Sequence, residues 1–312
     1  MSTTLPAAPR GTLPAMVRIE AIRFLRHPLF LVGVLAAYGV ELWLVLAGTE
    51  PGADGERHAV DLLSQPIIPA FFIGLPSLIV AARLTRSTEV AVEAMATAPG
   101  SEARRTLAVA GACVVPLVAG LGWLAELLVL AAAQPPHPQE LWFATVDDVY
   151  VWSILLALGP VACLGGALLG VLVGRWLSFR GASAVAVVLL VLATMAGQLP
   201  YAYSDQGNLR VWVPWAMFHS GTMSDGTAWE GIPGYAQALV PGNPAAYLGY
   251  TLVLCALAVV GAVWHDRSVR TSRLRVLGWG LLALAVALYL LAALTGFQDM
   301  IVSDPLPLDG AA

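Results

Sequence analysis

Long apolar runs, separated by short stretches in which the charges gather, constrain this chain more than any other feature of its sequence. Only 12% of the 312 residues are charged, whereas soluble proteins average about 25%. A soluble protein of this size needs polar side chains to cover its core, and this composition cannot supply them. The sequence therefore predicts a protein that is integral to a membrane.

The apolar runs also predict how many helices cross that membrane. A bilayer core about 30 Å thick is crossed by about 20 residues in helical form. The second run is the shortest and contains Pro69 and Pro76, so we expect it to be kinked or tilted. The predicted fold class is an all-α polytopic membrane protein with about seven transmembrane helices, at 28–48, 67–84, 106–133, 148–173, 182–199, 245–264 and 276–296.

Arginine alone sets the predicted orientation, because the sequence contains no lysine. With the N-terminus in the cytoplasm, fourteen of the sixteen arginines fall on the inner side, and only Arg57 and Arg210 fall outside. The same topology places the segment 200–244 and the tail 297–312 outside the cell. Together with a composition typical of a GC-rich genome, this predicts a multi-pass protein of a bacterial plasma membrane, with an extracytoplasmic C-terminus.

The residues before the first span are expected to form two parts. Residues 1–12 lack the apolar core of a signal peptide and are read as a cytoplasmic tail. Residues 13–27 predict an amphipathic helix on the inner leaflet, with Arg23 and Arg26 opposite an apolar stripe of Leu13, Val17, Ala21, Phe24 and Leu25. The alternative is a merely basic start to the first span. After these two parts, the transmembrane domain is expected to extend over 28–296.

Several kinds of chemistry have no residues to support them. A P-loop ATP site needs a lysine, so any ATP must be bound by another chain. The sequence contains neither H-E-x-x-H nor G-x-S-x-G, and its five histidines lie at span ends or in loops. Its three cysteines lie within apolar runs and are expected to be packing residues. We therefore expect no catalytic residue, no metal and no cofactor on this chain.

Two acids lie within predicted spans, Glu41 in the first and Glu126 in the third. An acid inside a membrane is by default a candidate for function. Both are candidates for lining a translocation path that handles a polar or cationic substrate. The alternative is a structural role in hydrogen bonding between helices.

The segment between the second and third spans carries the most specific local pattern, AARLTRSTEVAVEAMATAPGSEARR over residues 81–105. Thr88 is a plausible N-cap of a short helix that ends near Thr97, because Pro99-Gly100 stops it. A second helix is expected to begin at Ser101-Glu102. Such a helix offers a docking surface for a cytoplasmic partner, and the alternative is a solvated loop without a partner.

This pattern resembles the coupling helix in the permease subunits of ABC-2 type, or type V, ABC transporters. Those proteins begin with an elbow helix, matched by 13–27, and their coupling helix contains Glu, then leucines, then a small residue and Pro. Here Glu93, Met95, Thr97 and Pro99 fit that order. The sequence departs from it where Val90-Ala91 replace a Gly-Thr pair and where Met95-Ala96 replace the leucines. The likeness extends over most of the chain by layout, and over 81–105 by motif.

The resemblance implies the membrane subunit of an ATP-driven exporter. Two copies of a cytoplasmic P-loop ATPase would bind ATP and Mg and dock on Glu89, Glu93, Met95, Thr97 and Pro99. The chain would pair with a second copy or with a related permease, and no nucleic acid is expected as a partner. The family has six spans, so 276–296 would be an addition, either peripheral or a docking helix.

The family also caps its translocation path with short helices between spans five and six. The matching segment here, 200–244, is aromatic, and Trp212, Trp215 and Phe218 are candidates for an outer gate. The alternative is an amphipathic loop lying on the membrane.

The apolar walls of the predicted spans suit a hydrophobic or amphipathic substrate such as a drug, a lipid or a peptide. Two other functions stay open: a non-pumping sensory, immunity or assembly subunit, and a secondary transporter that uses Glu41 or Glu126.

Overall fold

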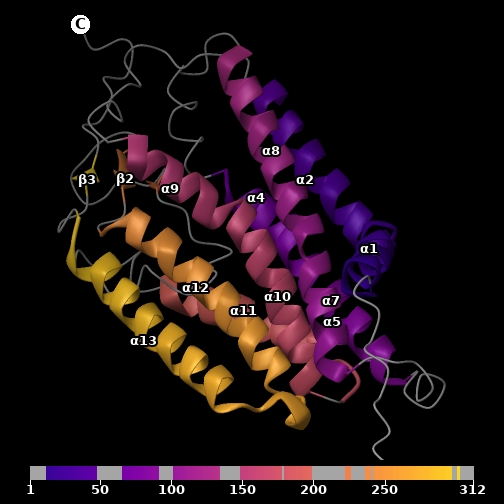
Figure 1. The fold of residues 1–312 in the computed structure, drawn as a ribbon. Coiled ribbons are helices and arrows are strands. Elements are labelled where there is room, and N and C mark those ends of the chain that lie inside the picture. Colours follow the sequence, from indigo (N-terminus) through magenta and orange to yellow (C-terminus); the bar gives the residue numbers. More distant parts are fainter. Residues whose placement is uncertain are drawn as a thin grey trace, which may run out of the picture.

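The computed structural model is a bundle of α-helices with three short strands near one end (Figure 1). It describes residues 12–47, 65–90, 101–133, 148–177, 179–198, 222–225, 236–239, 242–296 and 301–302. The α-helices are α1 (Thr12–Leu25), α2 (Pro28–Ala47), α4 (Ile67–Pro69), α5 (Leu75–Val90), α7 (Glu102–Ala112), α8 (Val114–Ala133), α9 (Asp148–Leu158), α10 (Pro160–Trp176), α11 (Ala182–Gln198), α12 (Pro244–Val263) and α13 (Ser272–Leu294). A π-helical turn (Ala70–Gly74) joins α4 to α5, and a 3-10 turn (Arg267–Val269) precedes α13.

The strands form one small antiparallel sheet in the order β1-β2-β3. They are β1 (Thr222–Asp225), β2 (Ala236–Leu239) and β3 (Ile301–Val302), and Thr222 pairs with Leu239, which pairs in turn with Ile301.

Five helical segments within the described residues are long and apolar enough to cross a membrane. A sixth is obtained if α1 and α2, which meet at a 64° bend, are counted as one broken span. The apolar part of α11 is shorter. A helical protein with several possible membrane spans is therefore confirmed, and the count of seven stays a prediction. The five segments are Ile67–Ser87, Glu102–Ala133, Asp148–Trp176, Pro244–Val263 and Ser272–Leu294.

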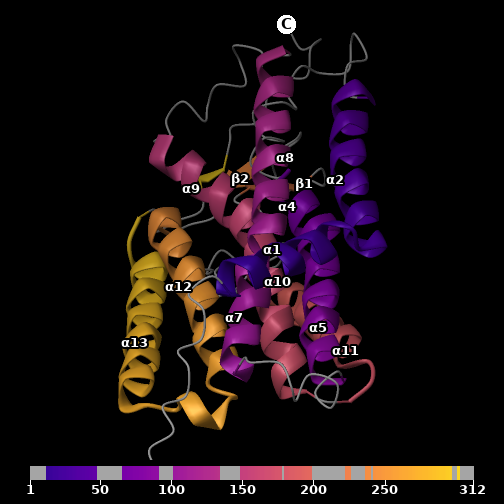
Figure 2. The ribbon, with the colours of Figure 1, turned by 45° about the vertical axis from the view of Figure 1, so that its right-hand side comes forward.

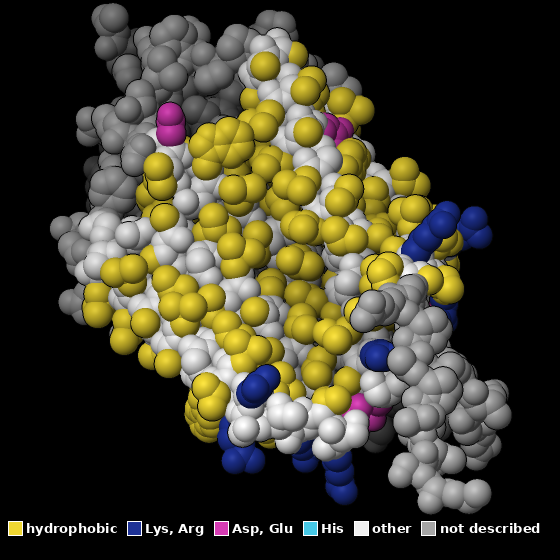
Figure 3. Space-filling view, viewed as in Figure 1, with side chains coloured by type: hydrophobic (Ala, Val, Ile, Leu, Met, Phe, Trp, Pro, Cys, Tyr) yellow, Lys and Arg dark blue, Asp and Glu magenta, His cyan; other side chains and the backbone are white. Residues whose placement is uncertain are grey.

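The surface is compatible with a membrane environment. In the view of Figure 3, hydrophobic side chains cover most of the described face, and arginine side chains lie along its lower and right-hand edges. Such a belt matches a protein whose middle faces lipid and whose arginines face water and headgroups. We refer below to the end of the bundle where α5, α7 and α13 have their arginines as the arginine-rich end.

Proline explains the irregular second span. Pro76 has no N–H to donate to the carbonyl of Phe72, so the regular helical pattern is interrupted there. The chain instead forms the π-helical turn 70–74. The Phe72 carbonyl lies against Gly33 of α2, at a point where a side-chain carbon would collide with it. The predicted kink is thus a local change of helix type, accommodated by a glycine on the neighbouring helix.

The third and fourth predicted spans are each divided into two helices. α7 ends and α8 begins around Cys113, three residues before Pro116. α9 and α10 are separated by Gly159, directly before Pro160. The residue before a proline avoids the helical region, which accounts for the second break.

α10 is the most buried helix of the bundle and packs on α5 through glycine (Figure 2). Gly170 faces the Leu78 carbonyl, and a side-chain carbon at Gly174 would lie 2.9 Å from the Ala82 carbonyl oxygen. Small residues spaced four apart let two helix backbones approach closely in a membrane. The three cysteines are also interior: Cys113, Cys163 and Cys255 are buried and unbonded to one another.

α13 lies at the edge of the bundle and packs chiefly on α12 (Figure 2). Its buried residues are three alanines, and most of its larger side chains are exposed. The backbone N–H of Asn243, at the start of α12, donates to the Ala292 carbonyl at 2.8 Å. The Asn243 side chain also donates to Thr295 Oγ1 at 3.2 Å. The predicted seventh span therefore lies at the edge of the described bundle, and its role as a docking helix stays a prediction.

One local prediction is wrong. Thr88 does not cap a new helix, because α5 continues without a break from Leu75 to Val90. Within this helix, Thr85 and Ser87 donate their hydroxyls to the carbonyls of Ala81 and Leu84, an arrangement that the helix accommodates.

Candidate functional site

The ends of three helices meet in a polar cluster at the arginine-rich end. We call Glu102, Arg175, His265 and Asp266 the anchor cluster. Glu102 Oε1, in the first turn of α7, lies 3.6 Å from Arg175 Nη1 near the end of α10 and 2.6 Å from His265 Nδ1 after α12. The Arg175 side chain is only 2% exposed. A buried guanidinium needs a nearby carboxylate, so this pair fixes α7 to α10.

Asp266 joins the loop after α12 to the start of α7. Its Oδ2 accepts a hydrogen bond from the Ala103 backbone N–H at 3.0 Å, and its Oδ1 accepts from Ser268 N at 2.9 Å and Ser268 Oγ at 2.7 Å. Burial by itself raises the pKa of this carboxyl, but these hydrogen bonds outweigh burial and leave the pKa below its usual value. The carboxylate therefore caps two structural elements at once.

Ser101 completes the cap of α7, as the sequence predicts. Its hydroxyl accepts from the Arg104 backbone N–H at 3.3 Å, and Glu102 occupies the first turn. An acid there is favoured by the partial positive charge of the helix N-terminus.

α1 is joined to the last turn of α5. Arg23 of α1 pairs with Glu20 at 2.9 Å and donates to Ser87 Oγ of α5 at 3.0 Å. α1 also packs on α7, where the Val17 side chain covers Gly111. A helix thus exists over 12–25, where one was predicted over 13–27. Of the predicted stripe, Phe24 is buried but Leu13 and Leu25 are 36% and 51% exposed, so the amphipathic elbow helix stays a prediction.

A second arginine ties α5 to the end of α10. Arg86 donates to the carbonyl oxygens of Leu177 and Phe179, which follow α10. Both flanks of the segment 91–100 are therefore held: the end of α5 through Arg23 and Arg86, and the start of α7 through the anchor cluster.

Most residues predicted for partner docking lie outside the described residues. These are Glu93, Met95, Thr97 and Pro99, and the same holds for the candidate gate residues Trp212, Trp215 and Phe218. Glu89 lies in the last turn of α5. The structure thus places the chain on either side of 91–100, and the docking residues themselves stay a prediction.

The two candidate acids of the translocation path lie on neighbouring helices. Glu41 is fully buried in α2, and Glu126 is half-buried in α8 with its Oε2 atom lacking a hydrogen-bond partner among the described residues. Between them, Tyr38 donates its hydroxyl to the Ala119 carbonyl at 2.9 Å and so joins α2 to α8. Because Glu41 is fully buried, it faces the protein and not lipid, as expected for an acid within a membrane span.

Sequence reasoning missed the anchor cluster. Glu102, Arg175 and His265 lie at the ends of three different apolar runs, up to 163 residues apart. The available signal was positional: each polar residue lies at the same predicted depth. No group of three or more metal-ligating side chains occurs among the described residues.

No protein-family model matches this chain, and neither a curated protein nor a solved structure is detectably similar to it. The fold and the site establish the class of the protein as helical and compatible with several membrane spans.

Proposed function

We propose that this chain is the membrane-spanning permease subunit of an ATP-driven exporter, with the N-terminus and the arginine-rich end in the cytoplasm. A separate P-loop ATPase, present in two copies, would dock on the segment 88–99 and hydrolyse ATP. The chain would pair with a second copy or a related permease and export a hydrophobic or amphipathic substrate. The arginine bias along the chain supports this orientation.

The observation that carries the proposal is the attachment of both flanks of the segment 91–100. A partner pushing on a loop moves the membrane helices only if the loop ends are fixed to them. Here one end is tied to α1 and to the end of α10, and the other to α10 and α12. A displacement of this segment would therefore be transmitted through α5 and α7 to α1, α10 and α12, which suits alternating access by rigid-body motion.

The geometry of α1 is consistent with the same function. The 64° bend between α1 and α2 is what an elbow helix needs to leave the membrane surface and enter the bilayer. Exposed Ile19, Ile22 and Leu25 on α1 would lie among lipids, and exposed Arg18 and Arg26 would reach headgroups.

The first test is affinity purification of the chain from its host membranes in mild detergent, with the bound proteins identified by mass. We expect a near-stoichiometric P-loop ATPase. Its absence from well-preserved membranes would remove the basis for the exporter.

The second test is Glu93→Arg, measured as ATP hydrolysis and substrate efflux in membrane vesicles. Reversing this charge at the docking surface is expected to leave the protein inserted and to uncouple ATP use from efflux. Glu140→Arg makes the same change in the predicted outer loop and is the matched control. Unchanged efflux in Glu93→Arg, or equal loss in both variants, would contradict the docking assignment.

A second candidate function, ion-coupled transport, is favoured by Glu126. An acid oxygen that is buried without a partner among the described residues suits a site that binds and releases a proton or cation. Glu126→Gln should then abolish ion-driven uptake, with Glu140→Gln as its control. Uptake that persists in Glu126→Gln would exclude this role for the residue.

A further inference from the structure

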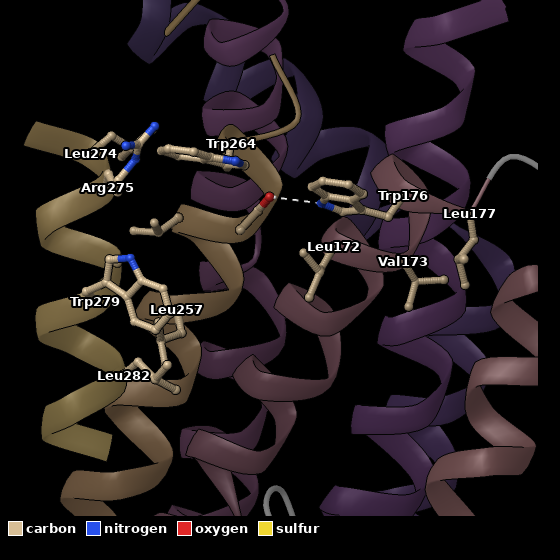
Figure 4. A pocket seen from close by; sticks show the side chains of 13 residues that line it. Leu172, Val173, Trp176, Leu177, Leu257, Trp264, Leu274, Arg275, Trp279 and Leu282 are labelled. Atoms are coloured by element: carbon tan, nitrogen blue, oxygen red, sulfur yellow. Dashed lines mark hydrogen bonds between the residues drawn. The ribbon is translucent and has the colours of Figure 1, made fainter. Parts of the chain in front are cut away.

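A large apolar groove lies between the ends of α10, α12 and α13 at the arginine-rich end (Figure 4). Its volume is about 840 Å³, within the range of about 300–1,000 Å³ that small-molecule sites occupy. Leu172 of α10, Leu257 of α12 and Leu282 of α13 are among its walls.

The groove changes character along its length. Leu257 and Leu282 lie at one end of the view in Figure 4, and Trp264 and Arg275 lie at the other. The two ends of the lining on α13, Leu274 and Leu282, are eight residues apart, which corresponds to about 12 Å of helix. That length matches most of one leaflet of a bilayer whose core is about 30 Å thick. The groove is thus apolar along most of its length and cationic at one end.

Arg275 lines the cationic end of the groove, and Arg270, which borders the adjoining pocket, contacts the same indole ring. The guanidinium carbons of Arg270 and Arg275 lie 5.9 and 6.0 Å from the centroid of Trp264, within cation–π range. Arg270 donates hydrogen bonds to the carbonyl oxygens of Trp264 and His265, at 2.8 and 3.3 Å, and these hold its side chain in place. The Arg275 guanidinium makes no hydrogen bond or ion pair within the described residues, so its donors are available to a ligand.

The local charge favours an anion. Residues 267–275 contain four arginines and no acid. Two acids lie near them: Asp266 accepts hydrogen bonds from Ala103 and Ser268, and Glu102 pairs with Arg175 and His265. A planar guanidinium that already stacks on an aromatic ring and keeps free N–H groups is a strong partner for a phosphate.

We propose that this groove is a binding site for one anionic phospholipid. Its acyl chains lie along the leucines of α10, α12 and α13, and its phosphate contacts Arg275 and Arg270. Trp176 and Trp279, which are 50% and 66% exposed, border the acyl chains of the lipid. Trp176 is fixed there by donating its Nε1–H to the Gly261 carbonyl at 2.9 Å. The site requires that the chain lies in a membrane, and it does not depend on export or on an ATPase.

Two glycines keep the groove open. Gly261 of α12 and Gly278 of α13 both line it, and a side-chain carbon at Gly261 would lie 3.1 Å from Leu172 of α10. A side-chain carbon at Gly278 would make ordinary contact with Val260, at 3.6 Å, so a larger side chain there would extend into the groove without disturbing the backbone. Gly280 on the same helix faces open space and is the matched control position.

Native mass spectrometry of the full chain in mild detergent tests the proposal. The probes are phosphatidylglycerol and phosphatidylcholine with identical acyl chains. We expect the wild-type protein to retain one phosphatidylglycerol in clear preference to phosphatidylcholine. Arg270→Gln with Arg275→Gln should weaken phosphatidylglycerol binding roughly 25-fold, about fivefold per arginine, and leave phosphatidylcholine binding unchanged. Arg273→Gln should change neither, because Arg273 lies on α13 like Arg275 but neither lines the groove nor contacts the Trp264 ring.

Gly278→Leu should lower the occupancy of both lipids, whereas Gly280→Leu should leave both as in wild type. Three results would overturn the proposal. Equal binding of the two lipids by the wild-type chain would show that charge plays no part. Competition by soluble glycerol phosphate as strong as that by the lipid would identify a free phosphate as the ligand. A dimer that Gly278→Leu dissociates would assign the groove to a second copy of this chain.

Discussion

Replacing Asp266 by alanine tests whether the anchor cluster holds the helix ends together. The carboxylate accepts three hydrogen bonds, and the Asp266 and Ala103 residues are only 8% and 5% exposed. Alanine would leave the buried Ala103 N–H without its acceptor, which costs about 1–3 kcal/mol. Loss of the cap on the 3-10 turn adds roughly 1 kcal/mol. We expect Asp266→Ala to lower the free energy of unfolding by about 2–4 kcal/mol.

The assay is unfolding by sodium dodecyl sulfate in mixed micelles at pH 7, followed by tryptophan fluorescence. Asp148→Ala is the control, because Asp148 is an exposed acid in the first turn of α9. It should cost less than about 1 kcal/mol, the contribution of a charge at a helix end. A loss in Asp266→Ala no larger than that in Asp148→Ala would refute the assignment of the cluster as a structural joint.

The pH dependence of the same residue gives an independent check. Because the pKa of Asp266 is lowered in the folded protein, its unfolded form takes up a proton first as the pH falls. Its stabilisation is therefore complete above the unfolded value of 3.8 and disappears as the pH falls through the folded pKa. Asp266→Asn should be less stable than wild type at pH 7. Its stability should also fall less on acidification, because it has no carboxylate at this position to protonate.

Two further predictions concern the packing of the helices and the bend between α1 and α2. Gly170→Leu should lower the free energy of unfolding by at least ~2 kcal/mol, because the new side chain collides with the α5 backbone. The control is Gly39→Leu, where a side-chain carbon meets open space, and it should change the free energy of unfolding by less than about 0.5 kcal/mol in the same assay. His27 Nδ1 accepts a hydrogen bond from the Leu29 N–H at 3.2 Å. Burial, and to a smaller extent the nearby Arg83, lower the pKa of His27 in the folded protein. The free energy of unfolding of the wild type should therefore fall as the pH drops from 6.5 toward the folded pKa. His27→Asn keeps an acceptor and should remove that dependence, and a wild-type protein whose stability is flat between pH 7 and 5 would contradict it.

The positions of the helices follow closely from the sequence. α2 and α12 begin and end within a residue of the predicted spans, because hydropathy alone defines apolar segments bounded by loops. α7 and α13 each begin four residues before the predicted span. Arginines lower the hydropathy of those turns, but the caps at Ser101 and Thr271 decide where the helices start.

The contacts between helices are harder to predict. The pairing of Glu102 with Arg175 and His265 depends on which span ends meet, and hydropathy does not contain that information. One packing signal was present: Gly166, Gly170 and Gly174 recur every four residues in α10, the spacing that brings two helices into close contact. It would have marked α10 as a central helix, although not α5 as its partner.

The burial of all three cysteines has a practical consequence for topology mapping. Cys113, Cys163 and Cys255 are between 0% and 4% exposed, so a thiol-reactive probe has little access to them in the folded chain. The unmodified protein is thus close to a cysteine-free background, and the native thiols need not be replaced. A single cysteine placed at Glu93 or Glu140 would then report, by its reaction with an impermeant maleimide from one side or the other, which end of the bundle faces the cytoplasm.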